Sequence, residues 1–118
     1  MQVFLVEDNE ELRDFLCASL KEAGIEAFGA ASVDKVAERI EENSFDIVVI
    51  DSVLGEGDGI GLIKTVRGGS KGADTPIVLT SAIATNLARR MALNAGCTEF
   101  LVKPFGAVAF INLLRRLA

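Results

Sequence analysis

The chain has 118 residues, half of them apolar, and a formal net charge of −5 with no histidine. This length fits one domain spanning residues 1–118, with a core large enough to fold without disulfides or a structural metal. The acidic balance argues against nucleic acid as a direct partner. The short apolar runs argue against a membrane segment, and the lack of histidine and of a Cys-x-x-Cys pair removes the usual zinc and iron sites.

Short apolar runs alternate along the chain with segments of helical periodicity. Runs of strand length stand at residues 3–6, 26–30, 47–50, 76–80 and 100–102. Apolar residues recur at helical spacing over residues 12–23, 33–40, 62–66, 85–95 and 107–117. Asp8 or Asn9 is expected to cap the first helix and Ser32 the second, whereas Asp58 and the glycines around it indicate a turn-rich loop.

Five strands alternating with five helices predict an α/β fold, a doubly wound parallel sheet with helices on both faces. In such a sheet, functional residues gather at the carboxyl ends of the strands. The polar residues expected there are Glu7 and Asp8 after the first strand, Asp51 after the third, Ser81 after the fourth and Lys103 after the fifth.

Three acids, one hydroxyl and one amine at a single edge suggest phosphoryl chemistry. Carboxylates ~4 Å apart repel by about 4 kcal/mol per pair at an effective dielectric near 20, so the cluster calls for a cation. A few carboxylates suit Mg²⁺, which takes hard oxygen ligands and keeps several waters. Asp51 is then the expected nucleophile that forms an acyl phosphate, Lys103 holds a phosphoryl oxygen as a point charge, and the Ser81 hydroxyl donates to another.

The sequence resembles the receiver domain of bacterial two-component response regulators over its whole length. The resemblance rests on LVEDNEELR, VVIDSVLGEGDGIGL, PIVLTSA and NAGCTEFLVKPF, in order and at strand ends. It implies a flavodoxin-like three-layer sandwich with five strands in the order 2-1-3-4-5. One departure is Gly55, which stands where this family often has proline.

The resemblance also implies roles for individual residues. Glu7, Asp8 and Asp51 are expected to bind Mg²⁺ together with the backbone carbonyl of Val53. Asp51 is the expected phosphoacceptor and Lys103 the phosphate-binding lysine, followed by Pro104 in a cis peptide bond. Ser81 and Phe100 are the expected switch residues.

The resemblance also implies which partners the domain has and how its signal is passed on. A sensor histidine kinase or a histidine phosphotransfer protein is the expected phosphoryl donor. The change is expected to be relayed to the face formed by the fourth helix, fifth strand and fifth helix. The partner at this face is an output domain or a target protein, and a homodimer with a second copy of the domain is the further option. The domain catalyses only its own phosphorylation and dephosphorylation. The chain shows no signal peptide, and its two cysteines, Cys17 and Cys97, are expected to be reduced and inert, which favours the cytoplasm.

Simpler interpretations stand beside several of these roles. Glu7 and Asp8 favour a helix start as well as a metal, Phe100 is typical of a core residue, and Thr80 rather than Ser81 is the alternative switch hydroxyl. Helix residues 87–90 form either a partner surface or a solvated face.

Two other functions share this architecture. A flavin carrier requires a phosphate loop after the first strand, where this chain has acids. An aspartyl phosphatase requires a second Asp two residues after the nucleophile, where this chain has Val53.

Overall fold

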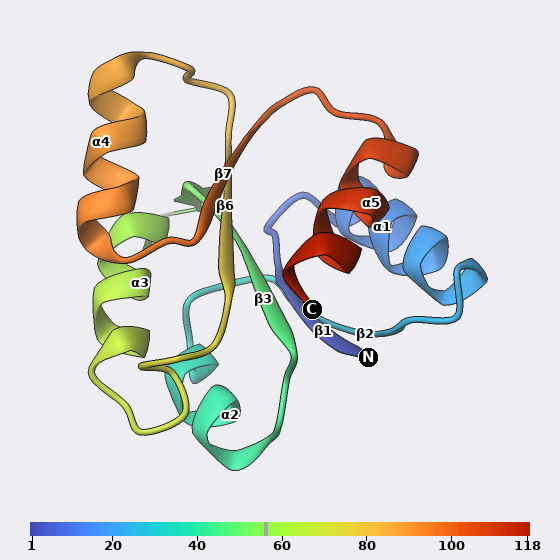
Figure 1. Cartoon of the computed structure of the whole chain (residues 1–118), viewed down its shortest axis with the longest axis horizontal. Coiled ribbons are helices and arrows are strands. Elements are labelled where there is room, and N and C mark those ends of the chain that lie inside the picture. Colours follow the sequence, from blue (N-terminus) through green and yellow to red (C-terminus); the bar gives the residue numbers. More distant parts are fainter. Residues whose placement is uncertain (56) are drawn as a thin grey trace.

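The structure, a computed structural model, describes residues 1–55 and 57–118. Five parallel strands form one sheet in the order β2-β1-β3-β6-β7, which confirms the predicted order (Figure 1). Their bounds are β1 Gln2–Val6, β2 Glu26–Ala30, β3 Ile47–Asp51, β6 Ile77–Ser81 and β7 Glu99–Val102. A separate two-stranded hairpin, β4 (Val53–Leu54) with β5 (Gly57–Asp58), follows β3 where the sequence indicated only a loop.

Helices cover both faces of the sheet, as predicted. One layer holds α1 (Glu10–Glu22) and α5 (Ala107–Leu117), and the other holds α2 (Val36–Glu42), α3 (Gly59–Arg67) and α4 (Asn86–Ala95) (Figure 1). Within the part of the chain that the structure describes, no helix has the length and apolarity needed to cross a membrane.

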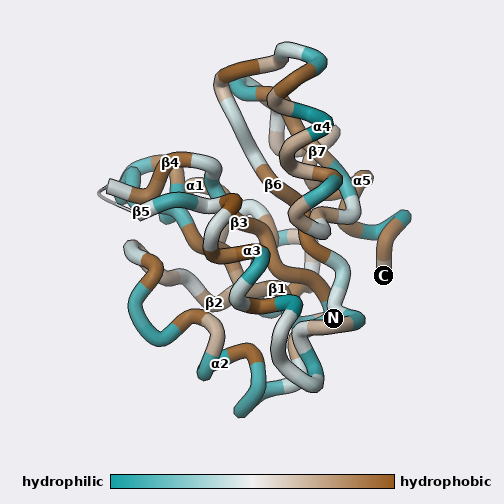
Figure 2. Tube along the Cα trace, turned by 90° about the vertical axis from the view of Figure 1, so that its left-hand side faces the viewer, coloured by the Kyte–Doolittle hydropathy of each residue, from teal (hydrophilic) through white to brown (hydrophobic). Residues whose placement is uncertain are grey.

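The central strands are apolar throughout because each face of the sheet has its own core. Phe4, Val48 and Ile50 pack toward α2, α3 and α4, whereas Val3 and Val49 pack toward α1 and α5. Successive side chains of a strand point to opposite faces, so a strand buried on both faces reads as a continuous apolar run. Figure 2 shows these hydrophobic segments running along β1, β3 and β6.

The register of the sheet brings the strand ends level. Val6 of β1 pairs with Ile50 of β3, so the residues that follow, Glu7 and Asp51, lie side by side at this edge of the sheet. On the other flank the N–H of Lys103 donates to the carbonyl of Ser81 at 2.8 Å and extends the β6–β7 ladder by one step.

Two local predictions require correction. Ser32 does not cap the second helix, because α2 begins at Val36, and the Ser32 hydroxyl instead accepts the N–H of Asp34 at 3.3 Å. Asp58 is not simply a turn residue: it ends β5 and caps α3, its Oδ1 accepting the N–H of Ile60 at 3.0 Å.

Candidate functional site

Asp51 is the last residue of β3, and its side chain lies in the cluster at the carboxyl edge of the sheet. The residue is 6% exposed. Its surroundings are fixed by backbone contacts: the N–H of Ser52 donates to Thr80 at 2.8 Å, and the N–H of Gly59 donates to Ser52 at 3.1 Å. A Cβ at Gly59 would collide with the Asp51 carbonyl oxygen, so the first residue of α3 approaches the Asp51 backbone as closely as glycine permits.

Lys103 bridges two of the predicted acids. Its Nζ lies 2.9 Å from Glu7 Oε1 and 3.1 Å from Asp51 Oδ2. The lysine follows β7, at the far end of the chain from Glu7, and the peptide bond to Pro104 is cis, as the resemblance implied. The ammonium therefore sits against the carboxylate predicted to receive the phosphoryl group.

The acidic pair is held differently at its two residues. Glu7 is 2% exposed, and its Oε2 accepts the N–H of Asn9 at 3.2 Å. Asn9, rather than Asp8, caps α1 through the N–H of Leu12 at 2.9 Å, which leaves the Asp8 side chain for the site. Asp8 is exposed, and its Oδ2 accepts the N–H of Gly55 at 2.8 Å.

The three carboxylates converge as the sequence predicted. One oxygen from each of Glu7, Asp8 and Asp51 lies within 4.8 Å of the others. An all-oxygen donor set of this charge fits a hard divalent cation such as Mg²⁺. The cluster therefore offers a chemically suitable place for the predicted ion, beside the Asp51 carboxylate.

The pKa shifts at the site reflect burial and the ion pairs. Burial has the largest effect on the pKa of Glu7 and raises it. The hydrogen bonds to Lys103 and Asn9 lower this pKa and the neighbouring Asp51 raises it, so that the pKa is raised overall. For Lys103, burial lowers the pKa, but the contacts with Glu7 and Asp51 outweigh it, so the pKa is raised overall. Lys103 therefore stays charged at neutral pH, and ionisation of Glu7 beside Asp51 is disfavoured.

The two predicted switch residues, Ser81 and Phe100, form no hydrogen bond with Asp51 in the described residues: Ser81 makes its hydrogen bonds with Ile83, and the Phe100 ring lies against Arg89. The buried Ser81 hydroxyl donates to the carbonyl of Ile83 at 3.3 Å and accepts the N–H of Ile83 at 3.1 Å. Phe100 is half-buried in the core on the α4 side, and the Arg89 guanidinium lies 5.0 Å from its ring centre. Both the core and the switch interpretations of Phe100 are compatible with this position.

Two apolar side chains stand at the exposed rim of the site. Val53 and Ile83 are 61% and 59% exposed. The N–H of Val53 lies 3.5 Å from Asp51 Oδ1, which places the start of the hairpin beside the acceptor. Whether the Val53 carbonyl binds the metal stays a prediction.

Sequence reasoning missed several positioning groups. The Arg13 guanidinium donates to the Glu7 carbonyl at 2.8 Å, and the Gly55 N–H holds Asp8. Farther away, Arg67 donates to the carbonyls of Gly72 and Gly96 at 2.7 and 2.9 Å, which joins the end of α3 to the segment after α4. The charge of Arg13 at the start of a helix was visible in the sequence, but its backbone acceptor was not.

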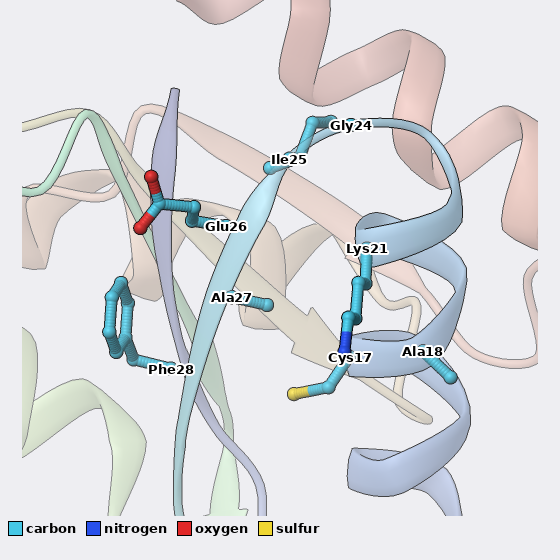
Figure 3. Close-up of a pocket in the computed structure, with 8 residues that line it drawn as sticks. All are labelled: Cys17, Ala18, Lys21, Gly24, Ile25, Glu26, Ala27 and Phe28. Atoms are coloured by element: carbon cyan, nitrogen blue, oxygen red, sulfur yellow. The ribbon is translucent and has the colours of Figure 1, made fainter.

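A cavity of about 470 Å³ lies elsewhere, between α1 and the start of β2 (Figure 3). Cys17 and Lys21 of α1 line it together with residues 24–28, at the opposite end of β2 from the carboxylates. Burial raises the pKa of the Cys17 thiol, which disfavours the reactive thiolate. None of the residues that line this cavity belongs to the carboxylate cluster.

The fold and the site define a class of protein, a flavodoxin-like domain whose sheet gathers acids and a lysine at the carboxyl ends of its strands. The chain belongs to the response regulator receiver domain family, which matches residues 3–115. This membership favours the receiver over the flavin carrier and the phosphatase considered above.

Individual relatives agree with this assignment. The chain is 32% identical over 104 residues to the KDP operon transcriptional regulatory protein KdpE of Escherichia coli, covering 88% of this chain and 45% of that protein. It is 28% identical over 104 residues to the phosphate regulon transcriptional regulatory protein PhoB of E. coli, with the same coverage. The chain thus spans about half the length of these curated relatives.

Solved structures show the same fold. Chemotaxis protein CheY4 of Vibrio cholerae superposes with a TM-score of 0.93 at 26% identity, covering 99% of this chain and 98% of that chain. The receiver domain of the sensor histidine kinase PA1611 of Pseudomonas aeruginosa superposes with a TM-score of 0.89 at 27% identity, covering 98% and 95%. That structure has a magnesium ion coordinated in its active-site cleft.

Proposed function

We propose that this domain is a phosphorylation-dependent switch of a two-component system or phosphorelay, and that Asp51 is its phosphoacceptor. The observation that carries the proposal is the buried Asp51 carboxylate, paired with Lys103 at 3.1 Å and grouped with Glu7 and Asp8. The donor is the phosphohistidine of a sensor histidine kinase or of a histidine phosphotransfer protein.

In the transfer, an Asp51 carboxylate oxygen forms a bond to phosphorus as the bond between phosphorus and the donor imidazole nitrogen breaks. The product is an acyl phosphate, and the imidazole leaves with the electron pair. Glu7, Asp8, Asp51 and the Val53 carbonyl would hold Mg²⁺, which would supply positive charge for the phosphoryl oxygens. Lys103 moves its contact from the Asp51 carboxylate to one of these oxygens, and both charges stabilise the transition state.

The output of the switch runs through Ser81 and Phe100. A phosphoryl oxygen offers the Ser81 hydroxyl a stronger acceptor than its present partner, the Ile83 carbonyl at 3.3 Å. Movement of the loop after β6 then favours an inward position of Phe100, a shift between two conformations that are both populated beforehand. The changed surface is the α4–β7–α5 face, which contacts an output domain, a target protein or a second copy of the domain.

The setting proposed is the cytoplasm, where sensor kinases present their phosphohistidines. The domain acts on no other substrate and catalyses only its own phosphorylation and dephosphorylation. The chain spans about half of the curated relatives it matches, and the proposed recipient of the signal is either an output domain in the same polypeptide or a separate target protein.

Replacing Asp51 by Asn tests the function directly. We expect the wild type to take up phosphoryl from acetyl phosphate only with Mg²⁺ present, and Asp51→Asn to take up none, because the amide is not a nucleophile. Intact-protein mass and a phosphate-affinity gel measure the product. Asp58→Asn is the matched control, since Asp58 is an exposed helix cap, and it should behave as the wild type. Equal uptake by wild type and Asp51→Asn would refute the assignment.

A second prediction concerns the lifetime of the acyl phosphate. Hydrolysis needs a water in line with the phosphorus–oxygen bond, and a polar side chain near that approach can orient the water. The rim residues Val53 and Ile83 have no hydrogen-bonding group, so we expect slow self-dephosphorylation. Val53→Asn should shorten the lifetime of the acyl phosphate by about tenfold, because its amide can hydrogen-bond the attacking water. This is less than the effect of a fully positioned general base.

The measurement labels the protein, removes the donor and follows the decay with Mg²⁺ present. Val53→Leu is the control, since it keeps an apolar side chain and should decay as slowly as the wild type. Decay of the wild type within seconds, or slower decay of Val53→Asn, would show that this interpretation of the rim is wrong.

A further inference from the structure

The turn of the β4–β5 hairpin contacts the Mg²⁺ site through one backbone donor. The N–H of Gly55 lies 2.8 Å from Asp8 Oδ2, although 47 residues separate the two in the sequence. Gly55 has a φ of +59°, in the left-handed region that favours glycine. The contact thus depends on a residue that can take up this backbone conformation and that also carries an N–H.

Both strands of the hairpin are anchored, which gives this donor a defined position. Leu54 is 3% exposed and belongs to the core on the α2, α3 and α4 side. Gly57 lies so close to the Val33 side chain that a Cβ there would stand 2.7 Å from it. Strand pairing of Val53 with Asp58 closes the hairpin directly ahead of α3.

Among the three predicted carboxylate ligands, Asp8 is the one least restrained by burial and by neighbouring side chains. Glu7 is buried and held by Lys103 and Asn9, and Asp51 is buried and held by Lys103, whereas Asp8 is exposed. An exposed carboxylate loses side-chain entropy when it binds a metal in one orientation. The Gly55 N–H restrains this carboxylate through Oδ2 and leaves Oδ1 unused by that contact.

We propose that the Gly55 N–H is a positioning group that holds the Asp8 carboxylate for Mg²⁺, and that the ion and the β4–β5 hairpin stabilise each other. The inference rests on the proposed role of Asp8 as a metal ligand. Partners of metal ligands typically change metal affinity by about 10- to 100-fold when they are removed. Coupling of this kind is reciprocal, so the ion must also hold the hairpin in place.

The first test removes the donor. Gly55→Pro has no N–H at residue 55, whereas Gly55→Ala keeps the N–H and shares the loss of glycine at a positive φ. We expect Gly55→Pro to bind Mg²⁺ about tenfold more weakly than the wild type, and Gly55→Ala to stay closer to the wild type. Titration with MgCl₂ at constant ionic strength, followed by amide chemical shifts of residues 7–9 in NMR spectra, measures the affinity.

The second test uses the wild type alone and so does not depend on a variant that folds. Exchange of the Gly55 amide hydrogen with solvent should slow severalfold in Mg²⁺ compared with EDTA. The amide of an exposed residue at the opposite end of the sheet, such as Ser44 ahead of β3, should not change. The proposal is wrong if Gly55→Pro binds Mg²⁺ as tightly as the wild type or more tightly, or if the ion leaves the exchange of Gly55 unchanged or speeds it. If the wild type binds no Mg²⁺ at all, the proposed function fails with it. If Mg²⁺ binds and Asp51 is phosphorylated but Gly55→Pro has no effect, only this inference fails.

Discussion

Replacing Lys103 by Met should lower phosphoryl uptake at Asp51 by about 100-fold, the typical effect of removing one preorganised donor to a developing negative charge. The same substitution should strengthen Mg²⁺ binding. The ammonium lies within 3.1 Å of two of the three carboxylates, Glu7 and Asp51, and competes with the ion for their oxygens. If the variant binds the ion more tightly but reacts more slowly, the role of Lys103 is to stabilise the charge of the phosphoryl group and not to help bind the metal.

The Lys103→Met variant should also be less stable without metal near neutral pH. Removing one member of a buried ion pair costs about 3–5 kcal/mol. The Lys103 side chain is 23% exposed, so the expected loss is smaller, about 2 kcal/mol, because solvent screens the charges.

The pH dependence of this loss follows from the two raised pKa values. Glu7, with a folded-state pKa above the ordinary carboxyl value, favours the fold while protonated, and this contribution is lost as the pH rises through the folded pKa. Lys103, also raised, stabilises the fold below the ordinary lysine pKa and loses this effect only as the pH rises through its higher folded pKa. The difference between wild type and variant should therefore be largest between these two ranges and shrink at both ends.

Urea unfolding in EDTA, followed by circular dichroism, measures this difference, since the chain has no Trp or Tyr for fluorescence. Lys64→Met, which removes an exposed lysine of α3, is the control and should change neither stability nor Mg²⁺ affinity appreciably. Weaker Mg²⁺ binding by Lys103→Met would contradict the idea that lysine and ion compete.

The sheet could be predicted from the sequence because its signal is strong and local. Runs such as Ile47–Ile50 are apolar at every position, which a strand covered by helices on both faces requires. The start of α2 could not be predicted, because Ser32 has the composition of a helix cap but uses its hydroxyl in a local turn. The β4–β5 hairpin was missed because two-residue strands leave no periodicity to detect.

The site shows the same division. Glu7, Asp51 and Lys103 could be predicted because each stands at or directly after the end of a strand, and a parallel sheet brings strand ends together. The support around them could not be predicted, because the acceptor for Arg13 is a backbone carbonyl and the donor to Asp8 is a backbone N–H. Every residue except proline carries both groups, so residue type gives little sign of which one is used.

The close approach of α3 to Asp51, the proposed phosphoacceptor, should have a large effect on stability and on phosphoryl uptake. Gly59 begins α3 against the Asp51 carbonyl oxygen, and a Cβ there would also lie 2.9 Å from the Ser52 Cα. Both neighbours are backbone atoms in or beside the central strand β3, so they cannot turn away as a side chain would. Gly59→Ala should therefore push α3 and the acceptor segment apart and destabilise the fold by about 3 kcal/mol, the upper part of the usual range for overpacking.

Gly61→Ala provides the matched control on the same helix. Its new Cβ would meet only the exposed Asp58 carboxylate, at 3.3 Å. Alanine is favoured over glycine inside a helix by roughly 0.5–1 kcal/mol, so Gly61→Ala should match or slightly exceed the wild type in stability. Denaturant unfolding of the three proteins gives the comparison. Under conditions in which Gly59→Ala remains folded, its phosphoryl uptake from acetyl phosphate should fall by about tenfold or more, because a small displacement of the nucleophile is costly. If Gly59→Ala were as stable and as reactive as Gly61→Ala, the contact between α3 and the Asp51 backbone would not be what fixes the acceptor in place.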